Sequence, residues 1–241
     1  MNIRQLIPVL AAWFFLGAFP SRVAAVEPEG VAVAIVFDTS GSMKEMVRDS
    51  SGKSSSKDVI ARRALDAVVK RFDAFATNGP GGVPRRVEIG LIVFDRGDVT
   101  VLKKFGPFDR KSAGQWAREI PQPSGGTPLG NALASASRAV MNSELPRKHI
   151  LVITDGMNTV GPDPATVLPR LKTVAEAQHT ALSVHFVAFD VDAKLFDPLK
   201  RLGATVVSAA DETQLNSQLG FILEKKILLE EEEPAPQPKT H

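Results

Sequence analysis

The sequence predicts an α/β fold of the doubly wound, Rossmann-like type, with a mostly parallel six-stranded sheet, one antiparallel edge strand and helices on both faces. Residues 31–37 form an apolar run rich in β-branched side chains, which is typical of a strand buried on both faces, although so short a run could also be a buried helix segment. Strand-like and helical segments then alternate along the chain, which implies right-handed crossovers. A four-residue polar turn at 95–98 joins two strands and makes that pair antiparallel.

Each predicted element depends on its own pattern of apolar residues. The sequence predicts strands at 31–37, 86–94, 99–105, 150–154, 181–189 and 205–208. It predicts helices at 58–76, 112–119, 128–141, 165–179, 193–202 and 211–229. Residues 44–56 are polar and rich in serine, and they predict a mobile loop. The turn contains Arg96-Gly97-Asp98, a tripeptide known from adhesion ligands, which we interpret as a hairpin turn without assigned function.

Both ends of the chain differ in composition from the rest. Residues 1–25 have the pattern of a secretory signal peptide, with small residues before a predicted cleavage after Ala25. An uncleaved anchor is the alternative, but the apolar run at 6–19 is shorter than the roughly 20 residues that span a bilayer. Residues 230–241 form an acidic, proline-rich tail that is expected to be disordered. We therefore expect one domain at 26–229 in a periplasmic or secreted bacterial protein, without stable membrane insertion after cleavage.

The composition argues against several classes of protein. The chain has no cysteine, so the fold depends on its core rather than on disulfides. It has 29 basic and 27 acidic residues, and loss of Arg4 and Arg22 with the signal peptide would leave 27 of each. Because no basic cluster is interleaved with aromatic residues, nucleic-acid binding is not expected.

Three short stretches carry oxygen ligands. Asp38, Ser40 and Ser42 follow the first strand, Thr127 precedes the helix at 128–141 as its expected N-cap, and Asp155 ends the strand at 150–154. Hard oxygen ligands of low total charge suit Mg²⁺ or Mn²⁺. Taken singly, each stretch could instead be a turn or a helix cap.

The five residues together resemble the metal-ion-dependent adhesion site of the von Willebrand factor type A family, written Asp-x-Ser-x-Ser, then Thr, then Asp. The resemblance covers roughly residues 30–226 and implies the strand order 3-2-1-4-5-6. It implies that Ser40, Ser42 and Thr127 bind the metal directly, with Asp38 and Asp155 acting mostly through water. The predicted metal is Mg²⁺, with Mn²⁺ and Ca²⁺ as alternatives.

The resemblance implies a divalent-cation-dependent module that binds a protein partner presenting a Glu or Asp to the metal. One alternative is an assembly or scaffold factor in which the metal is purely structural. Another is a metal-dependent hydrolase using Asp38, similar to the haloacid dehalogenase type, but that chemistry needs a second Asp where this chain has Ser40. No His is placed as a base: His149 opens the strand that Asp155 closes, and His185 lies inside a strand. We therefore do not expect an enzyme.

Overall fold

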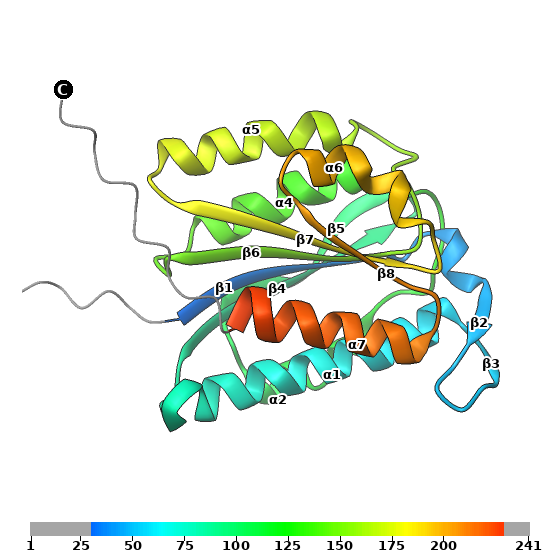
Figure 1. Ribbon diagram of the computed structural model, residues 1–241, viewed down its shortest axis with the longest axis horizontal. Helices are drawn as coiled ribbons and strands as arrows, with labels where there is room; N and C mark the ends of the chain where they lie inside the picture. The colour runs from blue at the N-terminus through cyan, green and yellow to red at the C-terminus, as the bar shows by residue number, and fades with distance from the viewer. Residues whose placement is uncertain (1–29, 229–241) are drawn as a thin grey trace, which may run out of the picture.

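The computed structural model describes residues 30–228, which form one six-stranded sheet with helices on both faces (Figure 1). The strand order is β5-β4-β1-β6-β7-β8, in which only β5 is antiparallel to its neighbour. The predicted fold class and strand order are confirmed. The predicted signal peptide and the whole of the predicted tail lie outside the described residues, as does residue 229. No helix between residues 30 and 228 has the length and hydropathy that crossing a membrane requires.

The strands have the following bounds: β1 (Gly30–Phe37), β4 (Arg86–Asp95), β5 (Asp98–Pro107), β6 (Arg147–Thr154), β7 (Ala181–Phe189) and β8 (Thr205–Ala209). β1 lies in the centre of the sheet, where it pairs in parallel with β4 on one side and β6 on the other. All eight residues of β1 are buried, as its continuous apolar run predicts.

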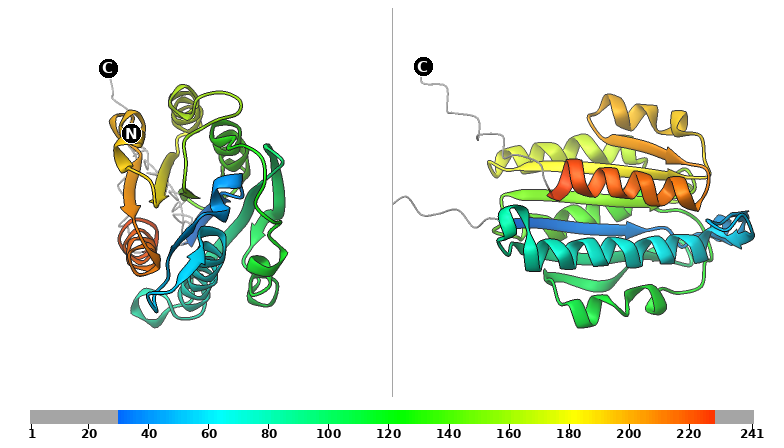
Figure 2. Two further views of the ribbon diagram at one scale, coloured as in Figure 1. Left: turned by 90° about the vertical axis from the view of Figure 1, so that its right-hand side faces the viewer. Right: turned by 60° about the horizontal axis from the view of Figure 1, so that its bottom comes forward.

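Two groups of helices cover the two faces of the sheet (Figures 1 and 2). One face packs against α1 (Lys57–Asn78), α2 (Arg110–Ala113), α3 (Trp116–Glu119), α7 (Glu212–Ile222) and the π-helical segment η4 (Leu223–Leu228). The other packs against α4 (Leu129–Met141), α5 (Pro164–Ala177), η3 (Ala193–Phe196) and α6 (Asp197–Arg201). Alternate residues of β1 enter the two cores, so Val33 and Ile35 face α1 while Ala32 and Ala34 face α4.

The interval 44–56, which the sequence predicts as a mobile loop, contains two short paired strands. The 3-10 turn η1 (Gly41–Lys44) leads into a hairpin of β2 (Met46–Arg48) and β3 (Ser54–Ser56), seen at the right of Figure 1. The Asp49 side chain accepts hydrogen bonds from Ser51 N, Lys53 N and the Ser51 and Ser55 hydroxyls. These bonds order a segment that has no apolar alternation.

Several predicted helices have different bounds. The helix predicted at 112–119 is two single turns, α2 and α3, and the one predicted at 193–202 is η3 followed by α6. The last helix is α-helical only to Ile222 and continues as η4. A short 3-10 turn, η2 (Pro80–Gly82), follows α1. His179 lies beyond the end of α5 with a φ of 54°, because the helix ends in a left-handed turn there.

Candidate functional site

Asp38 lies at the carboxyl end of β1, in the middle of the sheet edge where ligands bind in open α/β folds. Its backbone N–H donates to the carbonyl oxygen of Ile153 at 2.9 Å, which continues the pairing of β1 with β6. Its Oδ1 accepts from Ser40 N at 2.7 Å, and its Oδ2 accepts from the Thr154 hydroxyl at 2.5 Å. The side chain is therefore held on both oxygens by neutral donors.

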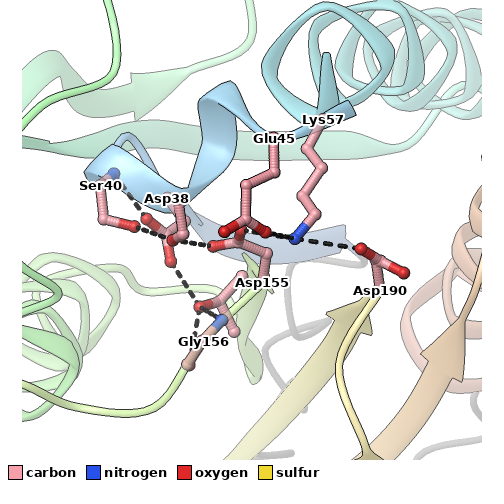
Figure 3. Close-up of polar contacts among 9 residues, drawn as sticks. Asp38, Ser40, Glu45, Lys57, Asp155, Gly156 and Asp190 are labelled. Atoms are coloured by element: carbon pink, nitrogen blue, oxygen red, sulfur yellow. Dashed lines mark hydrogen bonds and ion pairs between the residues drawn. The ribbon is translucent and has the colours of Figure 1, made fainter. Parts of the chain in front are cut away.

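The serine hydroxyls connect the loop after β1 to the end of β6 (Figure 3). Ser40 Oγ lies 3.1 Å from Ser42 Oγ, and the Ser42 hydroxyl donates to Asp155 Oδ1 at 2.8 Å. Asp38 and Asp155 directly follow two neighbouring parallel strands, so the topology places their carboxylates on the same edge. The structure thus brings four of the five sequence-predicted residues into one chain of polar contacts.

Thr127 lies in the adjoining loop, which packs against the loop after β1 through backbone contacts. Ser124 N donates to Thr39 O at 2.7 Å, and Gly41 N donates to Gly125 O at 3.0 Å. Thr127 itself is 4% exposed, and its N–H donates to the Thr159 hydroxyl at 2.8 Å. No hydrogen bond joins its side chain to the other four residues within the described part of the chain.

The predicted N-cap at Thr127 and the predicted first helical residue, Pro128, are each wrong by one position, because α4 begins at Leu129. The N-cap of α4 is Pro128, which has φ −87° and ψ 55°, and no side chain caps the helix. Because the chain turns at Pro128, Thr127 stays in the loop and its carbonyl oxygen accepts from Thr159 N at 2.9 Å. The Thr127 hydroxyl is therefore not used as a helix cap.

Lys57 is a site residue that the sequence analysis did not identify. Its ammonium lies 2.7 Å from Glu45 Oε2, 3.1 Å from Asp190 Oδ2 and 3.2 Å from Asp155 Oδ2. Burial would lower the pKa of Lys57, but these contacts outweigh burial and raise it. Thr154, which contacts Asp38, was missed as well, although the parallel register of β1 and β6 places it beside Asp38.

Burial makes the ionised form of the two carboxylates of the site, Asp38 and Asp155, unfavourable. Burial raises the pKa of Asp38 to about 6, with a further contribution from the nearby Asp155, although hydrogen bonds from Ser40 and Thr154 oppose the shift. Burial also raises the pKa of Asp155, against the effect of Ser42 and Lys57. Asp38 has no ion pair with a basic side chain of residues 30–228. A buried carboxylate without a counter-charge destabilises the fold unless it is protonated or binds a cation.

The chemistry of the donors fits a hard divalent cation. Two carboxylates and three hydroxyls are available, and Mg²⁺ is bound in proteins by few carboxylates together with neutral oxygens and water. Among residues 30–228 no three His, Cys, Asp or Glu side chains come together as a metal cluster. Any cation at this edge of the sheet therefore depends on the hydroxyls of Ser40, Ser42 and Thr127 as well as on the two Asp residues.

The histidines in the middle of the sheet are separate from this site. His149 Nδ1 and His185 Nε2 lie 3.1 Å apart with stacked rings, on the face of the sheet that packs against α7. His149 is at the start of β6, while Asp155 follows the end of that strand. Neither ring contacts a hydroxyl of the site.

Comparisons with known proteins agree with this fold. The family model described as "von Willebrand factor type A domain" matches residues 33–158. Comparison of the sequence with curated proteins found no match.

Among solved structures, the chain is similar to the PilB minor pilin from Streptococcus sanguinis, with 18% identity, a TM-score of 0.61 and coverage of 83% of this chain and 62% of the pilin. It is similar to proximal thread matrix protein 1 from the mussel byssus, whose metal-ion-dependent adhesion site (MIDAS) motif is occupied by zinc. The identity is 17%, the TM-score is 0.60, and the match covers 82% of this chain and 48% of the mussel protein. The vWF domain of the pili tip protein Mfa5 from Porphyromonas gingivalis is also similar, at 14% identity, a TM-score of 0.56 and coverage of 86% and 99%. The chain thus spans less than two thirds of the first two proteins.

Proposed function

Since the chain belongs to the von Willebrand factor type A domain family, we propose that it is a divalent-cation-dependent protein-binding module. The metal is held by Asp38, Ser40, Ser42, Thr127 and Asp155, and an acidic side chain of the partner completes its coordination. Mg²⁺ is the proposed ion, with Mn²⁺ and Ca²⁺ as alternatives.

The buried Asp38 carboxylate is the observation that carries this proposal. It lies at the end of the central strand, is fully buried and receives only neutral hydrogen-bond donors among the described residues. A cation at this position would supply the missing positive charge. The hydroxyls of Ser40 and Ser42 lie within the same chain of contacts and offer further oxygen ligands. The mussel protein with zinc at its MIDAS motif supports metal binding at this place in the fold.

Binding rather than catalysis is the proposed role of the metal. A cation held mainly by neutral hydroxyls stays electron-poor, so it attracts a further anionic oxygen. The Ser40 hydroxyl contacts the Ser42 hydroxyl and not a histidine, and a serine nucleophile needs a base. Exposed apolar side chains flank the site, among them Met46, one residue after Glu45, and Met157, two residues after Asp155. Such side chains suit a protein partner.

We also propose that the protein is exported to the periplasm or secreted. The composition of residues 1–25 supports this proposal, as does the similarity to a pilin and a pili tip protein. In this view residues 26–229 form the domain and residues 230–241 are an acidic tail.

The proposed function is tested by capture of partners from an extract of exported proteins. The immobilised protein is compared with its Asp38→Ala variant, in Mg²⁺ and in EDTA. The expected result is a protein that the unmodified chain retains in Mg²⁺ but not in EDTA, and that the Asp38→Ala variant does not retain. Asp163→Ala is the matched control, because Asp163 caps α5 on the same edge and is not a proposed ligand. Retention that is unchanged in EDTA and in Asp38→Ala would contradict metal-dependent binding and favour a scaffold with a structural metal.

A further inference from the structure

Lys57 lies in a position that is unfavourable for a lysine on two counts. It is the first residue of α1, where the helix dipole repels a positive charge. It is also only 3% exposed, and lysine is almost never buried unless it is paired. Because both features make lysine unfavourable here, we infer that the Lys57 ammonium has a specific role at this edge of the sheet.

The contacts of Lys57 join three separate segments at the site edge (Figure 3). Glu45 lies between η1 and β2, Asp155 follows β6 and Asp190 follows β7. The ammonium binds Asp155 through Oδ2, whereas the Ser42 hydroxyl binds Oδ1 of the same carboxylate. Lys57 therefore holds the orientation of the Asp155 carboxylate, with one oxygen toward the ammonium and the other toward the Ser42 hydroxyl.

The exposure of the three carboxylates decides how Lys57 affects the charge of the site. The side chains of Glu45 and Asp190 are 66% and 40% exposed, so solvent screens their charges. The side chain of Asp155 is fully buried. The buried charges at the site are thus two carboxylates, Asp38 and Asp155, and one ammonium.

We propose that Lys57 is a positioning residue that weakens cation binding and increases the demand of the bound cation for an anionic partner. This inference rests on the proposed metal site. Two carboxylates alone would neutralise a divalent cation. With the ammonium of Lys57 beside Asp155, the same cation leaves one net positive charge in a buried place. An acidic side chain of the partner neutralises that charge. Lys57 therefore lowers the affinity for the metal and raises the affinity of the metal-bound protein for its partner.

The test is a calorimetric titration of the purified protein with Mn²⁺ alone, compared with Lys57→Gln. Removal of a unit positive charge one carboxylate away from a divalent cation is expected to tighten Mn²⁺ binding by about tenfold. Lys57→Arg keeps the charge and is expected to bind Mn²⁺ within about threefold of the unmodified chain. Glu45→Gln, which removes an exposed contact of Lys57 and keeps the ammonium, is expected to change affinity by less than about threefold.

The thermal melts of the same proteins distinguish this role from a merely structural one. Without metal, Lys57→Gln is expected to melt at a lower temperature, because it leaves Asp155 buried without a counter-charge. With saturating Mn²⁺ its rise in melting temperature is expected to exceed that of the unmodified chain. If Lys57 had only a structural role, Lys57→Gln would bind Mn²⁺ more weakly than the unmodified chain, and Mn²⁺ would raise its melting temperature by less.

The outcomes separate this inference from the proposed function. If the unmodified chain binds Mn²⁺ and Lys57→Gln binds it equally well or more weakly, the inference is wrong but the proposed metal site is supported. Mn²⁺ binding by Lys57→Gln alone supports the inference but contradicts metal use by the natural chain. Absence of binding in both proteins overturns both.

Discussion

The backbone N–H of Gly41 donates to the carbonyl oxygen of Gly125 at 3.0 Å, which joins the loop after β1 to the loop that contains Thr127. Gly125 has a φ of 73°, and a Cβ placed on it would lie 2.5 Å from the carbonyl carbon of Arg96. The tight turn between β4 and β5 therefore packs directly against the Thr127 loop. Arg96 and Gly97 both have positive φ, as a two-residue hairpin turn of type I′ requires, which confirms the predicted turn.

Gly125→Ala is expected to lower the free energy of unfolding by about 2–4 kcal/mol and to weaken metal binding. The alanine suffers the strain of a left-handed backbone and also collides with Arg96, so the Thr127 loop must move. Gly52→Ala is the matched control, because Gly52 has a φ of 80° and open space around it. It is expected to cost about 1 kcal/mol without affecting the metal. Chemical denaturation and Mn²⁺ titration of both variants test this, and equal effects would contradict it.

Glu212 connects the start of α7 to the hairpin beside the site. Its Oε2 accepts from Ser50 N at 2.7 Å, and Arg63 binds both of its oxygens. Because Glu212 is 4% exposed, Glu212→Gln is expected to cost about 1–2 kcal/mol and to speed amide exchange at Ser50.

The matched control for Glu212→Gln is Glu224→Gln. Glu224 also pairs with an α1 arginine, Arg71, but its side chain is 53% exposed. Since exposed ion pairs contribute little, this change is expected to cost less than about 0.5 kcal/mol. Hydrogen exchange at Ser50 that is equal in the two variants would show that Glu212 does not hold the hairpin.

The buried histidine pair is expected to make the fold sensitive to acid. Burial lowers the pKa of His185 to about 4, with a contribution from Lys226, and burial lowers that of His149 well below its usual value, with contributions from His185 and Arg147. The histidines of the unfolded chain have a pKa near 6.5, so between about pH 6.5 and 4 the unfolded chain binds more protons than the folded chain. Stability is full above this window and decreases by about 3 kcal/mol for His185 as the pH falls through it.

This acid sensitivity is measured as the change in unfolding free energy between pH 7 and pH 4. His185→Asn is expected to reduce the loss, because its amide can pair with His149 without titrating. His179→Asn, which changes an exposed histidine, is expected to leave the loss unchanged. A loss that is equal in all three proteins would locate the acid sensitivity elsewhere.

Asp38 is expected to destabilise the metal-free protein at neutral pH. Because its pKa is raised to about 6 in the folded state, its contribution to stability is present at low pH and is lost as the pH rises through 6. Asp38→Asn removes this cost, which is about 3 kcal/mol at pH 7 from the shift in pKa. The asparagine can donate to the Thr154 hydroxyl, which can direct its own proton to Gly156 O at 3.1 Å.

Melting curves of the Asp38→Asn protein in EDTA and in Mn²⁺ check this prediction. In EDTA at pH 7 the variant is expected to melt at a higher temperature than the unmodified chain. In Mn²⁺ it is expected to show no further rise, since a proposed metal ligand is lost. A variant that is less stable in EDTA would indicate that the Asp38 charge is already compensated without a cation.

Much of the fold could be predicted from local sequence. The apolar runs at 31–37 and 150–154 identify two buried strands, and the family resemblance makes them neighbours. From these two facts the sequence places Asp38 and Asp155 at one edge, where the structure has them. The β2–β3 hairpin was missed because side-chain hydrogen bonds of Asp49 order it, and a run of serines has no alternation that reveals such bonds.

The contacts of Lys57 could not be read from the sequence at all. Its partners Glu45, Asp155 and Asp190 are separated from it by 12, 98 and 133 positions, and they meet only when the sheet assembles. A lysine at a helix start gives no local signal of a buried ion pair. The polar neighbours of the proposed site therefore have to come from the tertiary structure, whereas its proposed ligands follow a short motif.

The proposed cation site can be located in crystals of the protein grown with Mn²⁺ and measured with anomalous scattering. We expect one strong anomalous peak at the carboxyl end of β1, within coordination distance of the Ser40 and Ser42 hydroxyls, and no such peak in crystals of Asp38→Asn. If a well-ordered chain shows no peak at this edge, or shows its peak at another place, the five residues do not form the proposed metal site.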